Sequence, residues 1–144
     1  MSSQSEPMRV LIVDPCKSIR GLTISVLRRL GFSEFFESNN YVNAFEILVR
    51  KPINIVVTEV ITGDYDLFSF MDSINNHPEI EKKTVILMTS NVDTELVAKA
   101  AQYGVRGVIV KPFTPNQMQT VLAKAIKKGK TFNFSRKGFL FLLF

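Results

Sequence analysis

Cysteine is nearly absent from this sequence, since Cys16 is the only one among 144 residues. A single thiol cannot form a disulfide within the chain, which excludes a disulfide-stabilised secreted scaffold and favours a reducing compartment. Long apolar runs are also missing, and none approaches the roughly 20 residues that a membrane-spanning helix needs. Residues 1–7 are polar and lack the apolar core of a signal peptide. We therefore expect a cytoplasmic protein without a transmembrane segment, with residues 1–7 disordered.

Acidic residues are absent from the last third of the chain. Residues 96–144 hold nine Lys and Arg and no Asp or Glu, whereas residues 1–95 hold nine Lys and Arg and thirteen Asp and Glu. The charges of the two parts, +9 and −4, together give the net charge of +5. A basic segment of this kind suits nucleic acid, anionic lipid or an acidic protein, or is simply a solvated basic surface.

Short apolar runs alternate with segments of helical periodicity along most of the chain. The apolar runs, which we expect to be buried strands, cover residues 8–13, 33–38, 53–58, 84–90 and 106–110. The expected helices cover residues 16–31, 40–51, 66–76, 93–104 and 114–128. Each crossover is long enough for a right-handed βαβ unit. The pattern predicts one α/β domain over residues 8–128, with a doubly wound parallel sheet covered by helices on both faces.

Polar side chains end or follow four of the five expected strands. They are Asp14 after the first strand, Glu59 after the third, Thr89 at the end of the fourth and Lys111 after the fifth. The carboxyl ends of parallel strands meet at one edge of such a sheet, which is where these folds bind ligands. We therefore expect two carboxylates, a hydroxyl and an ammonium to converge on one small pocket. The residues alone leave open whether Glu59 is a catalytic group, a ligand or a disabled form of another site.

The ordered set of strand ends resembles the CheY-like receiver domain of bacterial response regulators over roughly residues 8–128. The matching pieces are the opening "VLIVD", a strand-end acid about 45 residues later, "TS" after the fourth strand and "KPF" after the fifth. The resemblance implies a flavodoxin-like five-stranded sheet with strand order 2-1-3-4-5. It also implies a non-enzymatic role in two-component signalling.

The resemblance assigns a role to each strand-end residue. Asp14 would be the first of two acids that hold Mg²⁺, and Glu59 would occupy the phosphoacceptor position. Thr89 would be the switch hydroxyl that contacts the phosphoryl group. Lys111 would pair with the acceptor and the phosphate, and the Lys111–Pro112 peptide would be cis.

Three positions depart from the family pattern. Pro15 replaces the second acid, so Mg²⁺ loses one carboxylate ligand. Glu59 is one methylene longer than the usual Asp, which moves its oxygens by about 1.5 Å, and phosphoryl transfer depends on position. Val108 stands where an aromatic switch residue is usual.

We therefore expect a degenerate, stand-alone receiver that signals through protein interaction without phosphorylation. We expect it to carry no cofactor, because Mg²⁺ binding at Asp14 and Glu59 is weakened. In that hypothesis Glu59 either imitates the phosphorylated state or forms a structural ion pair with Lys111.

A working phosphoacceptor is the first alternative. Such a receiver would hold Mg²⁺ on Asp14 and form an acyl phosphate on Glu59, or on Asp64 or Asp66 in the following loop. A small-ligand sensor is the second alternative, in which the basic last third binds a cyclic dinucleotide. The arginines include only one adjacent pair, Arg28-Arg29, which suits a solvated helix end better than a ligand site.

The expected partner is a signalling protein such as a histidine kinase, a motor or an effector. By resemblance it would dock on the face made by the fourth helix, the fifth strand and the fifth helix. The residues expected there are Lys99, Tyr103, Arg106, Lys124, Lys127 and Lys128. Such a basic face would attract an acidic partner, and the chain is also compatible with a homodimer.

Residues 129–144 form a basic, phenylalanine-rich tail, which is too short for a DNA-binding domain. Three uses of this tail stay open: packing on its own domain or on a second copy, docking on a partner, or lying on a membrane surface. The alternation in "TFNFS", residues 131–135, suits an added edge strand.

Overall fold

The computed structural model describes residues 7–128 and 141–143. The strands are β1 Arg9–Val13, β2 Glu34–Ser38, β3 Ile55–Glu59, β4 Thr84–Thr89, β5 Gly107–Val110 and β6 Phe141–Leu143. The helices are α1 Lys17–Arg29, α2 Tyr41–Arg50, α3 Leu67–Asn76, α4 Thr94–Gln102 and α5 Pro115–Lys128. The five strands and five helices predicted over residues 8–128 are therefore confirmed. None of the described helices combines the length and apolarity that a membrane crossing requires.

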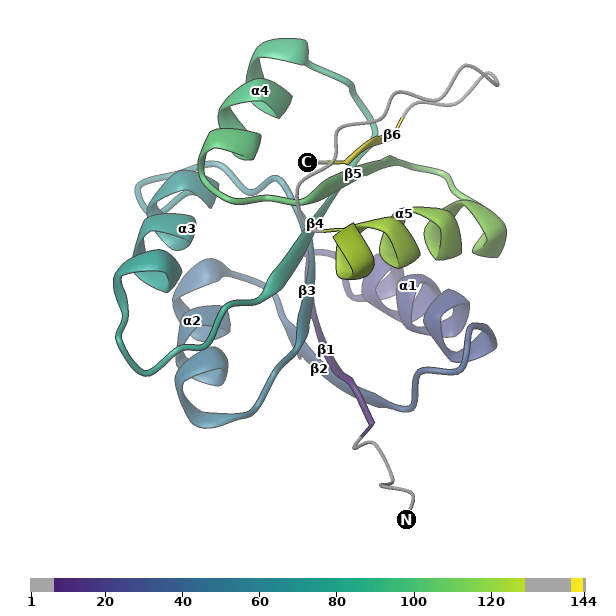
Figure 1. Ribbon diagram of the computed structural model, residues 1–144, viewed down its shortest axis with the longest axis horizontal. Coiled ribbons are helices and arrows are strands. Elements are labelled where there is room, and N and C mark those ends of the chain that lie inside the picture. Colours follow the sequence, from purple (N-terminus) through teal and green to yellow (C-terminus); the bar gives the residue numbers. More distant parts are fainter. Residues whose placement is uncertain (1–6, 129–140, 144) are drawn as a thin grey trace.

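The strands form one sheet in the order β2-β1-β3-β4-β5-β6 (Figure 1). The first five are parallel, which confirms the predicted order 2-1-3-4-5. The sixth strand extends the sheet beyond the five strands expected, and it pairs antiparallel with β5. It lies near the end of the tail, whereas the edge strand predicted at residues 131–135 lies outside the described residues, as does the predicted disorder of residues 1–6.

The helices cover both faces of the sheet. Figure 1 shows α2, α3 and α4 on one face and α1 and α5 on the other. Side chains that alternate along each strand divide between these two layers, as the two-residue period of a strand requires. From β1, Leu11 and Val13 pack under α2 and α3, whereas Val10 and Ile12 pack under α1 and α5, and all four are fully buried. A strand buried on both faces explains the continuous apolar run in the sequence.

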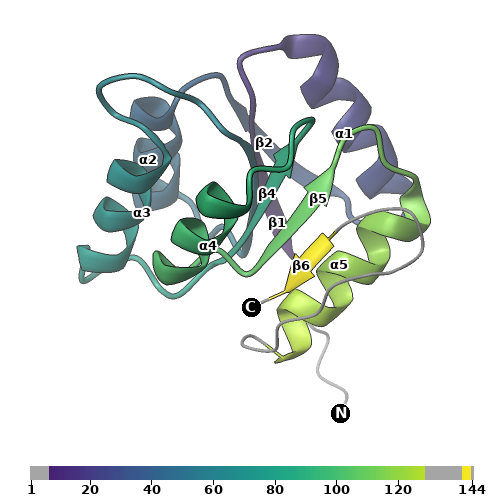
Figure 2. The same cartoon turned by 90° about the horizontal axis from the view of Figure 1, so that it is seen from above.

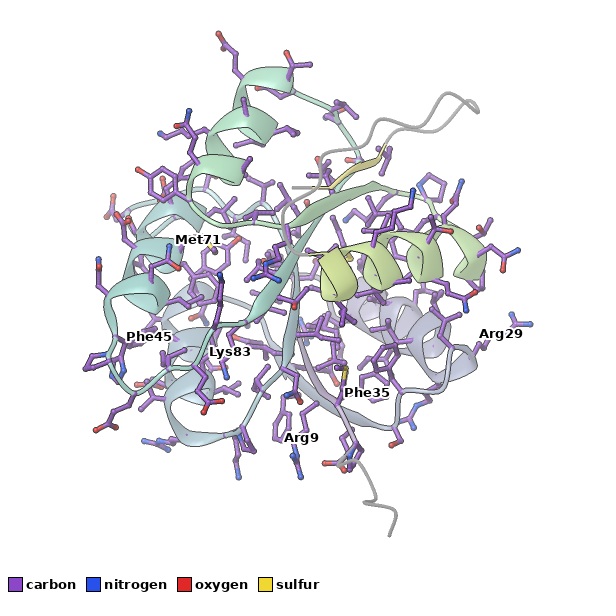
Figure 3. All side chains as sticks on the ribbon, viewed as in Figure 1. Arg9, Arg29, Phe35, Phe45, Met71 and Lys83 are labelled. Atoms are coloured by element: carbon purple, nitrogen blue, oxygen red, sulfur yellow. The ribbon has the colours of Figure 1, made fainter. Side chains whose placement is uncertain are left out.

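Figure 3 shows side chains filling both layers, with Phe45 and Met71 on the α2 and α3 side and Phe35 on the α1 side. The ring of Phe35 also contacts Arg28, whose guanidinium carbon lies 5.0 Å from the ring centroid. Arg29 extends away from α1 into solvent in the same view. The two adjacent arginines therefore have different surroundings.

Polar side chains begin the helices that follow β3 and β5. The side chain of Asp66 accepts a hydrogen bond of 3.0 Å from the backbone N–H of Ser69 in α3. This bond holds the pKa of the Asp66 carboxyl below its usual value. At α5, Thr114 and Gln117 each accept a hydrogen bond from the backbone N–H of the other, at 3.1 and 2.8 Å. These bonds satisfy N–H groups that a helix start leaves unpaired, and they fix where α3 and α5 begin beside the site.

Candidate functional site

The carboxylate of Asp14 is held immediately after β1 and is almost completely buried, with 3% of the residue exposed. Its Oδ1 accepts a hydrogen bond of 2.8 Å from the backbone N–H of Cys16, at the start of α1. Arg20 donates to the backbone carbonyl of Asp14 at 2.6 Å and to the carboxylate of Glu37 at 2.8 Å. These hydrogen bonds hold the turn between β1 and α1 in place, and with it Asp14 at the end of the sheet.

The ammonium of Lys111 joins the two carboxylates that the sequence predicted to be close. Its Nζ lies 2.6 Å from Glu59 Oε2 and 3.6 Å from Asp14 Oδ2. Both contacts are ion pairs, and the one with Glu59 is the closer by 1.0 Å. Asp14 Oδ2 is accordingly buried with no hydrogen-bond partner. Lys111 thus favours the longer side chain of Glu59 over Asp14.

Both carboxylate oxygens of Glu59 are engaged in the structure. Oε2 faces Lys111, and Oε1 accepts a hydrogen bond of 2.8 Å from the backbone N–H of Val60. The side chains of Glu59 and Lys111 are 20% and 18% exposed, so solvent screens the pair only partly. Glu59 is therefore fixed by its neighbours in a position where its charge is matched.

Thr89 ends β4 at the same edge of the sheet, but its hydroxyl takes part in a local turn. The hydroxyl donates to the backbone carbonyl of Asn91 at 2.8 Å and accepts from the backbone N–H of Asn91 at 3.1 Å. The backbone carbonyl of Thr89 accepts from the N–H of Lys111 at 2.8 Å. The structure thus brings the backbones of Thr89 and Lys111 together, whereas contact of the hydroxyl with an anion stays a prediction. The predicted cis peptide between Lys111 and Pro112 is present.

In the described part of the chain, the strand ends offer Mg²⁺ two carboxylates, Asp14 and Glu59, and no third acidic side chain. This ion requires near-octahedral coordination by oxygen, and Pro15 supplies no side-chain oxygen. Asp14 Oδ2 is the one carboxylate oxygen of Asp14 and Glu59 without a hydrogen bond or a cation within 3 Å. Among the described residues, no group of three His, Cys, Asp or Glu side chains could hold a metal ion. The ammonium of Lys111 supplies the positive charge between the two carboxylates.

Tyr41 is a part of the site that sequence reasoning missed. Its hydroxyl lies 3.0 Å from Thr58 Oγ1 and donates to the backbone carbonyl of Glu59 at 2.6 Å. Its ring stacks on Phe70 of α3 with centroids 4.6 Å apart. Burial raises the pKa of the Tyr41 phenol to about 12. Tyr41 therefore ties α2 and α3 to the end of β3, directly beside the Glu59 carboxylate.

A groove of about 600 Å³ opens beside Lys111, between α1 and the loop that leads from β5 to α5. Its walls are largely apolar and include Leu22, which is 63% exposed, and Phe113. Its charged lining residues are Arg29 and Lys111. The groove thus combines apolar surface with positive charge next to the ion pair.

The expected output residues fall into separate groups. Lys99 Nζ lies 4.2 Å from the ring centroid of Phe68, and the rings of Phe68 and Tyr103 lie 4.9 Å apart. Lys99 and Tyr103 are one helical turn apart and share the side of α4 that contacts α3. Arg106 precedes β5 and Lys124 lies on α5, both half-buried. The side chains of Lys127 and Lys128 lie outside the described residues, and Val108 is fully buried.

Comparisons with known proteins give the same fold and a family. Probable chemotaxis protein CheY of Rhizobium etli is 29% identical over 120 residues, which cover 83% of this chain and 93% of that protein. Chemotaxis protein CheY-3 of Vibrio cholerae is 30% identical over 121 residues, which cover 84% and 93%. The structure of Vibrio cholerae chemotaxis protein CheY4 aligns with a TM-score of 0.74 at 20% identity, covering 83% of this chain and 98% of that one.

The signal receiver domain of a putative Luxo repressor protein from Vibrio parahaemolyticus aligns with a TM-score of 0.75 at 20% identity, covering 87% of this chain and 94% of that one. At this identity the two solved structures support the fold alone. The family model of the response regulator receiver domain matches residues 10–123, which include all of β1 to β5 except Arg9 and every strand-end residue of the site. With that match over most of its length, the chain belongs to the response regulator receiver domain family.

Proposed function

We propose that this receiver is a cytoplasmic signalling module that acts through protein interaction and does not use phosphoryl transfer as its switch. The observation that carries the proposal is the ion pair of 2.6 Å between Lys111 Nζ and Glu59 Oε2. In this pair the cation already neutralises the carboxylate at the proposed phosphoacceptor position. Relatives named as chemotaxis proteins support a place in a two-component pathway, as a binding module without enzymatic activity.

The geometry opposes phosphorylation of Glu59 in two ways. Attack on a phosphoryl group would use an oxygen whose negative charge is already matched by Lys111 or by the N–H of Val60, which lowers its nucleophilicity. The incoming phosphate would also lack a divalent ion to neutralise its charge, because the donor set contains Pro15 at the second acidic position. Asp66 caps α3 with its carboxylate, so it is an unsuitable acceptor as well.

Beryllofluoride, which mimics a phosphoryl group, tests the proposal directly. We expect amide NMR spectra of the chain with Mg²⁺ and beryllofluoride to match the spectra without them, because the site lacks the ligands that would hold the complex. The amides to follow are those of Thr89 and Lys111. Shifts at these residues that require Mg²⁺ would show a working phosphoacceptor and would overturn the proposal.

A double-mutant cycle on Glu59 and Lys111 measures how strongly the ion pair stabilises the fold. Lys111→Met removes the cation facing two carboxylates, so we expect it to lower the free energy of unfolding by about 1–3 kcal/mol, less than for a fully buried pair because both side chains are partly exposed. Chemical denaturation checks this value. Glu59→Gln with Lys111→Met is the matched control, and we expect it to be less destabilised than the sum of the two single variants.

The variant Glu59→Gln also separates the two hypotheses for Glu59 when its partner binding is measured beside its stability. A structural ion pair predicts that Glu59→Gln changes stability and leaves partner binding unaltered. Imitation of the phosphorylated state predicts that Glu59→Gln weakens partner binding in a chain that remains folded. Additive effects of Glu59→Gln and Lys111→Met would contradict an energetically coupled pair, whichever role it has.

A further inference from the structure

The sixth strand occupies the edge of β5. It pairs antiparallel over three facing pairs, Gly107 with Leu143, Val108 with Leu142 and Ile109 with Phe141. Figure 2 shows this strand, in yellow, beside β5 and between α4 and α5. All other neighbouring strands of the sheet are parallel. The last residues of the chain therefore cover the edge that would otherwise expose unpaired backbone groups of β5.

An exposed strand edge is a template for adding another strand. The backbone of β5 supplies the hydrogen-bonding groups, and α4 and α5 flank the added strand on either side (Figure 2). The occupant in the structure is short, with three residues. Net stabilisation of about 0.5–1.5 kcal/mol per hydrogen bond makes the closure of so short a strand weak compared with the whole fold. Opening this edge would therefore cost less free energy than unfolding the domain.

Twelve residues join α5 to β6 in the sequence. Residues 129–140 separate the two elements, and these twelve residues reach about 40 Å when extended. A connection of this length permits β6 to return to its own β5, and it also permits β6 to reach the β5 of a neighbouring molecule. The facing pairs are identical in both arrangements, so the two differ mainly in chain entropy and in the cost of association.

We propose that the edge of β5 is a strand-addition surface whose partner is a second copy of this chain. In the resulting dimer, β6 of each copy pairs antiparallel with β5 of the other copy. The occupant follows from the structure, because Phe141–Leu143 is the segment that already fits this edge. A second copy carries the same segment, and reciprocal exchange closes both edges at once with two-fold symmetry. Protein concentration then decides between the closed monomer and the exchanged dimer.

The inference goes beyond the proposed signalling function and does not depend on it. The experiments below use the protein alone, without a signalling partner. A negative result for strand exchange would therefore leave the proposed signalling function in place. Where both hold, the exchange also controls access to the surface between α4 and α5. A partner that docks there meets an edge closed by β6, in cis or in trans.

Isotope-filtered NMR on the full chain separates exchange from closure. Uniformly ¹³C,¹⁵N-labelled and unlabelled chains are denatured together, refolded as an equal mixture and observed at high concentration. We expect NOEs between the amide of Val108 in one copy and the Hα of Leu142 in the other, because these residues face each other across β5 and β6. NOEs found only within one copy at every concentration would overturn the exchange.

A shortened connection gives an independent test by light scattering. Deletion of residues 131–138 leaves four residues between α5 and β6, which reach about 14 Å and hinder return to the same β5. We expect this variant to dimerise at least tenfold more tightly than the full chain. Adding Leu142→Pro, which disfavours strand pairing, should restore the monomer. A dimer that survives Leu142→Pro, or a shortened chain that is folded by circular dichroism and monomeric, would contradict the proposal.

Discussion

A chain that carries both Pro15→Asp and Glu59→Asp is expected to bind beryllofluoride in a Mg²⁺-dependent manner, where the native chain does not. The first substitution adds the missing carboxylate beside Asp14. The second shortens the side chain by one methylene, which withdraws its oxygens from Lys111 by about 1.5 Å. Together they provide oxygen ligands for the metal and a carboxylate that is free to meet the phosphoryl mimic. Amide shifts of Thr89 and Lys111 upon titration measure the gain.

The single variants are the matched controls for this gain. Glu59→Asp keeps Pro15, and Pro15→Asp keeps the bond between Glu59 and Lys111, so each lacks one of the two requirements. We expect each to bind the Mg²⁺–beryllofluoride complex at least about tenfold more weakly than the double variant, the effect typical of losing one supporting group at a metal site. Equal responses of the native chain and the double variant would mean that Pro15 and Glu59 do not disable the site.

The grouping of Asp14, Glu59 and Lys111 could be predicted because topology determines it. Each residue ends or directly follows a buried strand, and in a parallel sheet the ends of such strands meet at one edge. No knowledge of side-chain conformation is needed for that prediction. The preference of Lys111 for Glu59, with Nζ at 2.6 Å against 3.6 Å from Asp14, required the structure because it depends on rotamers and side-chain length.

The hydroxyl of Thr89 shows where the same reasoning stops. Topology places Thr89 at the correct strand end, but its hydroxyl bonds to the backbone of Asn91, two residues along the chain. Short hydroxyl side chains commonly form such local bonds, which compete with longer-range contacts. A strand pattern carries no information about this competition, so the anion-contact role could not be decided from the sequence.

The antiparallel strand β6 could be anticipated only as an edge strand somewhere in the tail. Alternation predicts such a strand at residues 131–135, which lie outside the described residues, and the structure pairs Phe141–Leu143 with β5. Residues 139–144 are a continuous apolar run, which does not distinguish a strand from other buried segments by periodicity. Pairing at the sheet edge depends on β5, which is distant in the sequence, as much as on the segment that pairs with it.

Tyr41 is expected to make the fold sensitive to alkaline pH. Burial raises the pKa of its phenol from 10.0 to about 12. The unfolded chain therefore releases this proton first, and the free energy of unfolding falls as the pH rises from about 10 through about 12. A shift of two units corresponds to a loss of about 2–3 kcal/mol once both states are deprotonated. Absorbance of the ionised phenol, followed together with circular dichroism, measures the titration and the unfolding.

Tyr41→Phe removes the hydroxyl and retains the ring that stacks on Phe70. We expect this variant to lose about 1 kcal/mol at neutral pH, because the bond to the Glu59 carbonyl disappears while Thr58 still donates to it at 2.8 Å. The steep loss of stability above pH 10 should disappear with the phenol. Tyr65→Phe, which removes a hydroxyl bonded to Ser73 on α3, is the control and should keep the titration near pH 12. If the alkaline loss persisted in Tyr41→Phe, a group other than Tyr41 would control the alkaline sensitivity.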